Sequence, residues 1–360
     1  MLLEGIFPAI TTPFYPDSRI YLRKLEHNVE HYSRTMAAGM VVLGSTGEAV
    51  MLGDEETRDV LRHAAHAAAA DKVMIAGVAR ESVHETLKLA EYAAELQYDA
   101  VLVRTPHYYG PLYTRDPQPM LTYYRTLADR SPLPVIVYSI PKFTHYEVPL
   151  EMVTELAQHP NVIGIKDSSG SLERLTALVA ATRLAPKRKV TVTPVFTAVT
   201  SRMMTAEAEV AVITPSFVSA ELLGTDPTLA SPMALAGSWP RLQTRTKEVG
   251  FQVLSGSAEL LLPALEAGIS GAILAFAAPA PQACQEIYTA WKENDPVVAR
   301  EKQQRIVQPS RIVAAKYGIP GLKYACDLNG YYGGVPRLPL LPVNEEQKAE
   351  IAAAMEDVRN

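Results

Sequence analysis

A lysine follows directly after a run of small and apolar residues, in the stretch Val162-Ile-Gly-Ile-Lys166, and turn-forming residues come next, from Asp167 to Gly170. This pattern predicts a buried strand that ends in an amine. A neutral amine adds to a ketone to give a Schiff base, and burial disfavours the charged form of a lysine. The protonated imine withdraws electrons from the adjacent carbon, which makes Lys166 a candidate for covalent catalysis. Taken alone, a lysine at a strand end is more often solvated or ion-paired than nucleophilic.

Phenol and hydroxyl groups follow other predicted strands. Tyr138 begins the run Tyr138-Ser-Ile-Pro141, and a phenol can carry protons while an imine forms or a carbon–carbon bond is made or broken. The run Gly44-Ser-Thr-Gly47 is a tight turn whose backbone N–H groups can bind a carboxylate. Together with the lysine, these features fit a 2-oxo acid. Each also has a simpler explanation, with Tyr138 as a core residue, the turn as a helix cap, and Tyr108 and Tyr109 as packing.

Short apolar runs alternate with longer segments of helical spacing, as expected for repeating β–α units. The predicted strands are 5–10, 40–43, 73–77, 100–104, 135–138, 162–166, 251–254 and 271–275. The predicted helices are 22–36, 54–69, 83–96, 119–128, 150–158 and 171–182. This pattern indicates an α/β fold, a closed (β/α)8 TIM barrel, whose active site lies at the carboxyl ends of the strands. No GxGxxG motif follows an early strand, which argues against a dinucleotide-binding fold.

The predicted organisation is a barrel over residues 1–290 and a C-terminal helical extension over residues 291–360. An irregular insertion at about 187–249 interrupts the barrel, because this segment is rich in Thr, Ser, Ala and Pro and has no clean period. The favoured interpretation is a surface insertion that is partly disordered. The alternatives are a lid, an oligomer contact, and non-coding sequence translated in error.

Composition limits the possible partners. The formal net charge is −5 with both signs mixed along the chain, so we expect no nucleic-acid partner. No apolar run reaches the length of a membrane span, so we expect no membrane partner. The start lacks the features of a signal peptide, and only Cys284 and Cys326 are present, which predicts a cytoplasmic protein, with a mitochondrial location left open. The histidines, including His63 and His66, have no metal-ligand spacing, so we predict no metal and no cofactor.

Three motifs in order carry a resemblance to a known family. Gly44-Ser-Thr-Gly-Glu48, Tyr138-Ser-Ile-Pro141 and Gly164-Ile-Lys-Asp167 resemble motifs of the dihydrodipicolinate synthase / N-acetylneuraminate lyase family of pyruvate-dependent class I aldolases. The resemblance covers residues 4–184 and 250–345. It implies a TIM barrel, a 2-oxo acid substrate such as pyruvate, and a homo-oligomer, either a dimer or a tetramer.

The resemblance also implies roles for single residues. Lys166 would form the imine and Tyr138 would carry protons. Ser45 and Thr46 would hold the keto-acid carboxylate, with Ser45 linked to Tyr138. Tyr108 would reach the proton relay of a neighbouring subunit. The remaining residues expected near the substrate are Ser168, Gly256 and Ile273.

The substrate is predicted from the subfamily. Phe143 stands where dihydrodipicolinate synthases have an arginine for the semialdehyde carboxylate, which argues against that reaction. Its neighbour Lys142 is expected to face the opposite way, toward solvent, on an extended segment. The run from Tyr317 to Lys323 and the run from Gly330 to Gly334 resemble eukaryotic 4-hydroxy-2-oxoglutarate aldolases.

We therefore predict reversible cleavage of a 4-hydroxy-2-oxo acid to pyruvate and an aldehyde, with glyoxylate as the first choice. The alternatives are a 2-keto-3-deoxy sugar-acid aldolase, a 4-hydroxy-tetrahydrodipicolinate synthase, and a non-catalytic barrel that binds a keto acid.

Overall fold

The computed structural model describes residues 1–205 and 242–359. In these ranges, eight parallel strands form one sheet in the order β1-β10-β9-β6-β5-β4-β3-β2. The strands are β1 (Gly5–Pro8), β2 (Gly39–Val42), β3 (Val73–Gly77), β4 (Ala100–Arg104), β5 (Val135–Ser139), β6 (Val162–Asp167), β9 (Gln252–Ser255) and β10 (Gly271–Leu274). Just beyond the end of β1, the N–H of Ile10 donates to the carbonyl of Val41 over 3.1 Å, which brings the two edge strands together. The predicted TIM barrel is confirmed.

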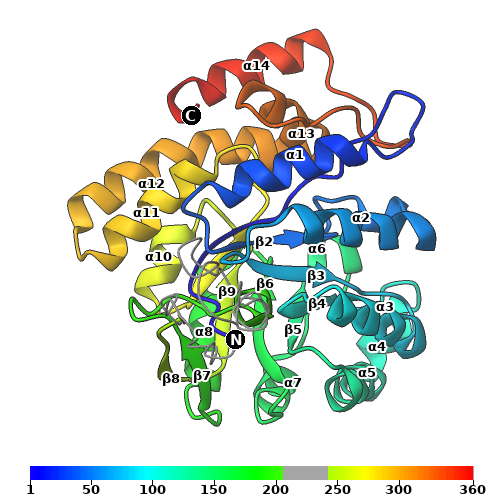
Figure 1. Cartoon of the computed structure of the whole chain (residues 1–360), viewed down its shortest axis with the longest axis vertical. Helices are drawn as coiled ribbons and strands as arrows, with labels where there is room; N and C mark the ends of the chain where they lie inside the picture. Colours follow the sequence, from blue (N-terminus) through cyan, green and yellow to red (C-terminus); the bar gives the residue numbers. More distant parts are fainter. Residues whose placement is uncertain (206–241, 360) are drawn as a thin grey trace, which may run out of the picture.

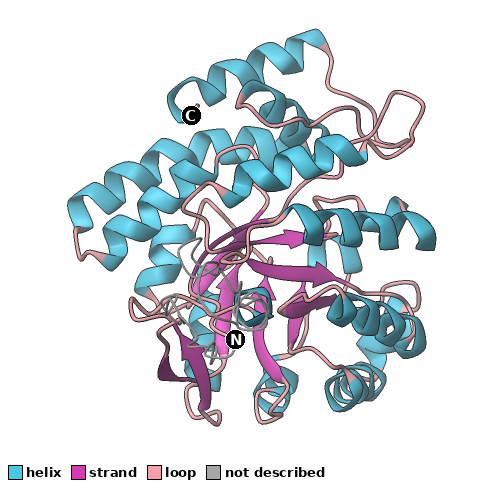
Figure 2. Cartoon of the chain, in the orientation of Figure 1, coloured by secondary structure: helices cyan, strands magenta, loops and turns pink. Residues whose placement is uncertain are grey.

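Helices surround the strands, as Figure 2 shows. They are α1 (Leu22–Ser33), α2 (Asp54–Ala67), α3 (Val83–Glu95), α4 (Gly110–Arg115), α5 (Gln118–Arg130), α6 (Pro141–Thr144), α7 (Leu150–Leu156), α8 (Leu172–Thr182), α10 (Leu261–Glu266) and α11 (Pro281–Lys292). The Ser82 side chain caps α3 by accepting a hydrogen bond from the N–H of Glu85, as the Ser-x-x-Glu pattern predicts. None of the helices in the described ranges is long and apolar enough to cross a bilayer.

The C-terminal extension is helical, as predicted. It comprises α12 (Pro296–Ser310), a π-helical turn (Arg311–Lys316), α13 (Gly318–Leu328) and α14 (Glu345–Met355). Figure 1 shows α12 beside α11, and α13 and α14 on the side of the barrel that carries α1. The extension therefore covers one side of the barrel, where its loops can reach the strand ends.

The barrel interior is filled by alternate residues of the strands. Phe7, Ile75, Leu102 and Ile136 are among the buried members of one apolar cluster inside the sheet. Their neighbours along the strands belong to a second cluster, between the sheet and the helices. This alternation follows from the period of two of a β-strand, and it decides which strand-end residues point into the mouth of the barrel.

The predicted insertion at 187–249 begins and ends in regular structure. β7 (Arg188–Val192) and β8 (Arg245–Val249) form an antiparallel hairpin, and residues 206–241 between them lie outside the described ranges. Val190 and Val192 pack against Leu2, and Arg188 donates to the carbonyl of Val162 over 2.7 Å. These contacts lie at the amino ends of the barrel strands, so the hairpin is at the opposite end from Lys166.

Candidate active site

Three side chains lie in register across neighbouring strands at the mouth of the barrel. Arg104 on β4 pairs with Tyr138 on β5, and Tyr138 pairs with Lys166 on β6. Residues in register on parallel strands share a face of the sheet, and Tyr138 belongs to the interior cluster. The strand ends therefore place a cation, a phenol and an amine side by side on the inner wall.

The Lys166 amine lies over the ring of Tyr138, 4.2 Å from the ring centroid. Lys166 is only 5% exposed, yet within the described residues its amine makes no ion pair and no hydrogen bond. The Tyr138 hydroxyl likewise has no hydrogen-bond partner in these ranges. Both groups are thus held in place by packing, and neither the amine nor the hydroxyl is engaged by a polar partner in the described ranges.

The neighbour of the lysine faces the other way and fixes the strand end. The Asp167 side chain is fully buried and pairs with Arg174 Nε over 2.8 Å. Arg174 also donates to the carbonyl of Val148 and to Glu147. Because successive residues of a strand alternate between faces, this anchored carboxylate helps to keep the Lys166 side chain directed into the barrel.

The turn from Gly44 to Glu48 lies beside these groups. The Thr12 hydroxyl donates to the Gly47 carbonyl over 2.7 Å, and a Cβ at Gly47 would approach the Ile10 carbonyl oxygen to 3.2 Å. Glu48 itself has a left-handed backbone, with φ 54°. The glycine at position 47 therefore allows the turn to pack closely on the end of β1.

A buried ion pair anchors this turn to the C-terminal extension. Glu48 Oε1 lies 2.6 Å from Lys323 Nζ, and both side chains are 0% exposed. Glu48 Oε2 accepts a hydrogen bond from the N–H of Arg337 over 2.8 Å, and the Arg337 guanidinium binds both oxygens of Glu56 at 2.7 Å. Burial lowers the pKa of the Lys323 amine, although Glu48 acts against this shift. In the sequence, Glu48 and Lys323 stand out only as members of two separate motifs, and nothing there indicates that they meet.

A cavity of about 560 Å³ opens at the mouth of the barrel. Of the predicted site residues, Ser45 and Tyr138 line it, together with residues of the extension from Ala315 to Pro320. Lys166 adjoins the cavity through the Tyr138 ring that it covers. In the described residues no hydrogen bond joins Ser45 to Tyr138, so the link that the resemblance implies is not formed in this structure.

The other predicted residues lie around this centre. Thr46 is buried in the turn, and Ile273 is buried inside the barrel on β10. The N–H of Gly256 donates to the Asp167 carbonyl over 2.7 Å, and a Cβ at Gly256 would lie 1.9 Å from Ser168 Oγ. A glycine is therefore required at position 256 for the chain to pass Ser168. None of these four lines the cavity in the described part of the chain.

Tyr108 lies apart from the cavity. Its side chain is on the loop after β4, is 75% exposed, and packs edge-to-face on Tyr109 at 5.0 Å between ring centroids. Its N–H donates to Glu81 over 3.1 Å. A role in the relay of another subunit stays a prediction.

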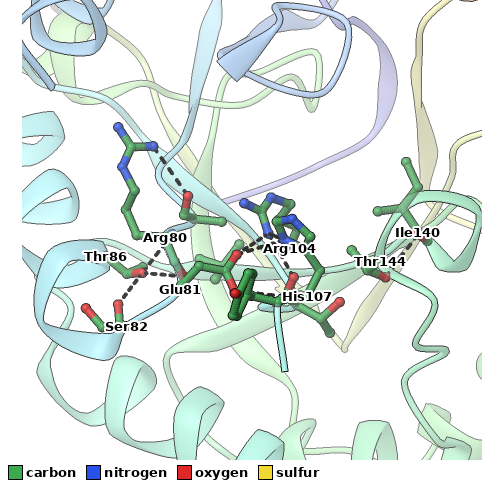
Figure 3. Close-up of polar contacts among 12 residues, drawn as sticks. Arg80, Glu81, Ser82, Thr86, Arg104, His107, Ile140 and Thr144 are labelled. Atoms are coloured by element: carbon green, nitrogen blue, oxygen red, sulfur yellow. Dashed lines mark hydrogen bonds and ion pairs between the residues drawn. The ribbon is translucent and has the colours of Figure 1, made fainter. Parts of the chain in front are cut away.

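The segment after β5 is helical, not extended. Pro141–Thr144 form α6, and the Thr144 hydroxyl donates to the Ile140 carbonyl over 3.1 Å, as Figure 3 shows. Phe143 is 54% exposed, and Lys142 Nζ lies 5.8 Å from its ring centroid. The expectation that Lys142 and Phe143 face opposite ways along an extended segment is wrong, because both line the cavity.

The described ranges contain no group of three or more His, Cys, Asp or Glu side chains placed to hold a metal ion. His63 pairs with Glu26 over 2.6 Å instead. Both cysteines are buried, and burial raises the pKa of the Cys326 thiol to about 12. At neutral pH these thiols are therefore protonated and unreactive.

The fold and the site define a class of protein: a TIM barrel with a buried lysine at the end of the sixth barrel strand, beside a tyrosine on the fifth. A family model described as the dihydrodipicolinate synthetase family matches residues 2–186 and 236–358. The chain belongs to this family, whose members are class I pyruvate-dependent aldolases, and it is an enzyme of the lyase class. Most of the predicted insertion falls between the two matched stretches.

Relatives and solved structures agree with this assignment. A 4-hydroxy-tetrahydrodipicolinate synthase of Acidiphilium cryptum is 28% identical over 354 residues, which are 98% of each chain. One from Methanothrix thermoacetophila is 26% identical over 97% of this chain and 95% of the relative. The fold matches a dihydrodipicolinate synthase of Bacillus anthracis with a TM-score of 0.76 at 22% identity, covering 100% of both chains. It also matches a prophage protein of the same family from E. coli K12, in complex with pyruvate, with a TM-score of 0.75 at 22% identity over 99% of both chains.

Proposed function

We propose that this enzyme forms a Schiff base between Lys166 and a 4-hydroxy-2-oxo acid, and cleaves it reversibly to pyruvate and an aldehyde, with glyoxylate as the first choice. The observation that carries the proposal is the buried Lys166 amine in register with Tyr138, 4.2 Å from its ring centroid. The pyruvate complex of the related prophage protein supports pyruvate as the keto-acid part.

The reaction can be written with the residues at hand. Lys166 attacks C2 of the substrate, and Tyr138 donates its phenolic proton so that the C2 oxygen leaves as water. A protonated imine and a phenolate remain. Tyr138 accepts the proton of the C4 hydroxyl, the C3–C4 bond breaks, its electron pair moves into an enamine, and C4 leaves as the aldehyde. The enamine then takes that proton back from Tyr138 at C3. Water hydrolyses the protonated imine to release pyruvate and the free amine, and the proton set free returns to the Tyr138 phenolate. Ser45 and Thr46 would hold the substrate carboxylate at the turn after β2.

A second candidate is a 4-hydroxy-tetrahydrodipicolinate synthase, because the curated relatives carry that name. That reaction starts from the same imine and joins pyruvate to aspartate semialdehyde. Phe143 argues against it, because an apolar ring cannot form the bidentate pair that an arginine forms with a carboxylate. The same imine would also serve a sugar-acid aldolase, and the same cavity would serve a non-catalytic barrel that binds a keto acid. The exposed ring of Tyr108 is compatible with the predicted dimer or tetramer.

Trapping with borohydride tests the imine. Incubation with pyruvate and borohydride should add one reduced pyruvyl group to Lys166, located by intact mass and peptide mapping. Lys166→Arg keeps the charge but cannot form the imine, so it should lose both label and turnover. Lys189→Arg, an exposed lysine on β7 at the far end of the barrel, is the control and should retain both. A label on another lysine, or none, would refute the mechanism.

Turnover identifies the reaction. We expect measurable cleavage of 4-hydroxy-2-oxoglutarate and no useful condensation of pyruvate with aspartate semialdehyde, compared as kcat/KM on one preparation. A faster semialdehyde reaction would overturn the substrate assignment and leave the Schiff base intact. Label without turnover of any substrate would favour the non-catalytic barrel.

A further inference from the structure

An arginine occupies the inner wall of the barrel mouth. On β4, Ala100 and Leu102 belong to the cluster inside the barrel, so the alternation of the strand directs Arg104 to the same side. Arg104 also lines the cavity. A charged side chain at the end of the apolar run Ala100–Val103 costs desolvation free energy unless it is paired, and Glu81 supplies part of that pairing through Nη1.

Its distance from the reacting amine suits a small substrate. Arg104 is in register with Tyr138, and Tyr138 with Lys166. Neighbouring strands are about 4.8 Å apart, so the backbones of Arg104 and Lys166 are separated by about 10 Å. Arg104 lines the cavity, and the Lys166 amine lies 4.2 Å from the ring centroid of Tyr138, which lines the same cavity. A substrate with a few carbons can therefore bridge an imine at Lys166 and a charged contact at Arg104.

One end of the guanidinium is anchored and the other is open. Arg104 Nη1 donates to the Thr105 carbonyl and contacts His107 Nδ1, each at 3.0 Å, and lies 3.3 Å from Glu81 Oε1, as Figure 3 shows. Glu81 is itself fixed by the N–H groups of His107 and Tyr108. Within the described residues Nε and Nη2 of Arg104 have no hydrogen-bond partner. Those two atoms form the side edge of the guanidinium that binds a carboxylate through two parallel hydrogen bonds.

A neighbouring arginine provides the contrast. Arg80, after β3, has a similar side-chain exposure, 22% against 16% for Arg104. Its Nη2 donates to the Thr57 hydroxyl and to Asp54, and Arg80 is not among the residues that line the cavity. Arg80 therefore has a structural role, while the free edge of Arg104 has none in the described part of the chain.

The charge of the cavity agrees with an anionic ligand. Arg104, Lys142 and Lys316 line it, and the one carboxylate among its described lining residues is Glu48. Glu48 is already neutralised by Lys323. Lys316 is likewise paired with Glu350, and Arg104 with Glu81. In the described residues, Lys142 is therefore the lining cation that has no ion pair.

We propose that the Nε–Nη2 edge of Arg104 binds a carboxylate on the aldehyde partner, so that the preferred substrate is a 4-hydroxy-2-oxo dicarboxylate and not a sugar acid whose aldehyde half is uncharged. The inference rests on the proposed function, because it assumes an imine at Lys166. In this proposal the aldehyde carboxylate is bound at the end of β4, and not by the segment after β5, where Phe143 stands.

The test compares two aldehydes in the direction of carbon–carbon bond formation. Pyruvate is combined with glyoxylate, which carries a carboxylate, or with glyceraldehyde, which does not. Arg104→Gln should lower kcat/KM for glyoxylate by about 10- to 150-fold, the loss expected for hydrogen bonds to a charged group. The value for glyceraldehyde should change by less than about 3-fold, since uncharged contacts remain. Arg104→Lys should recover part of the glyoxylate rate because it keeps the charge but not the fork.

Two measurements separate the possible failures. Arg80→Gln is the matched control and should leave both rates near those of the wild type. Borohydride trapping of pyruvate on Arg104→Gln should equal that of the wild type, which shows an intact fold and imine. An equal loss for both aldehydes, no loss for glyoxylate, or a wild type that prefers glyceraldehyde would overturn the role of Arg104 and leave the Schiff base standing. Absence of a pyruvate label in the wild type would overturn the proposed function and this inference with it.

Discussion

Replacing Lys323 by methionine should destabilise the protein strongly and weaken the binding of pyruvate, although the residue does not line the cavity. The Lys323 amine is fully buried against Glu48 at 2.6 Å and donates to the Val335 carbonyl over 2.8 Å. Methionine has a similar length and fills most of the same volume. The substitution therefore removes the charge and leaves the packing of α13 close to its original state.

The size of the expected destabilisation follows from the Glu48 carboxylate, which Lys323→Met leaves buried without its partner. Removing one partner of a buried ion pair costs about 3–5 kcal/mol, because the other charge stays buried and unpaired. Glu48 retains the hydrogen bond from the N–H of Arg337, which places Lys323→Met in the lower part of that range, at about 3–4 kcal/mol of unfolding free energy. Glu48→Gln should cost a similar amount. The double variant has no buried charge at either position, so it should cost well below the sum of the two.

Urea unfolding at one fixed protein concentration measures this coupling, since association would otherwise alter the apparent stability. Lys348→Met is the matched control, because Lys348 pairs with Glu345 on the surface of α14, where Glu345 is 90% exposed, and it should cost less than about 0.5 kcal/mol. In parallel, KM for pyruvate should rise in Lys323→Met, because Glu48 ends the turn that would hold the substrate carboxylate. If the double variant loses the full sum of the single losses, or if Lys323→Met behaves like the control, the ion pair is not what fixes the turn.

Three further predictions concern the chemistry. Tyr138→Phe keeps the ring that packs against Lys166 but removes the proton carrier. The value of kcat should therefore fall by about 10²–10⁴-fold, and pyruvate trapping should slow. A smaller loss in stopped-flow and steady-state rates would show that Tyr138 is only a core residue. Phe143→Arg supplies a guanidinium beside the cavity and should raise kcat/KM for aspartate semialdehyde by at least about 10-fold; an unchanged rate would show that position 143 does not contact that substrate. EDTA should leave activity unchanged because the imine itself is the electron sink, and inhibition that Mg²⁺ or Zn²⁺ reverses would contradict this.

The strands of the barrel could be predicted from the sequence because each is a short apolar run that ends at a turn. The predicted strand at 73–77 agrees with Val73–Gly77, and the one at 100–104 with Ala100–Arg104. Central strands of a barrel are buried on both faces, so they appear as apolar runs and not as weak alternations. A search for apolar runs does not find β7, because its two buried residues, Val190 and Val192, alternate with polar ones. A two-stranded hairpin on the surface gives a much weaker signal.

The groups at the site can be predicted in part, for a related reason. Lys166 and Tyr138 are recognisable because each directly follows an apolar run. Glu48 and Lys323 meet across 275 residues of chain (323 − 48), and no local pattern connects them. Four residues, Pro141–Thr144, form a helix that is too short for a periodic signal.

The position of Arg104 could have been predicted from the sequence, although no motif marks this residue. Once β4 is assigned, the alternation that puts Leu102 inside the barrel puts Arg104 there too, and the register of a parallel sheet places it beside Tyr138. In a barrel, the imine chemistry needs one lysine and one proton carrier, while the second substrate can be held from any strand end that faces the same cavity. A cation on β4 and a cation after β5 approach that cavity from adjacent strands. The loss of an arginine at position 143 therefore does not by itself remove carboxylate recognition, and selectivity among carboxylated aldehydes would depend on which of the two strand ends carries the guanidinium.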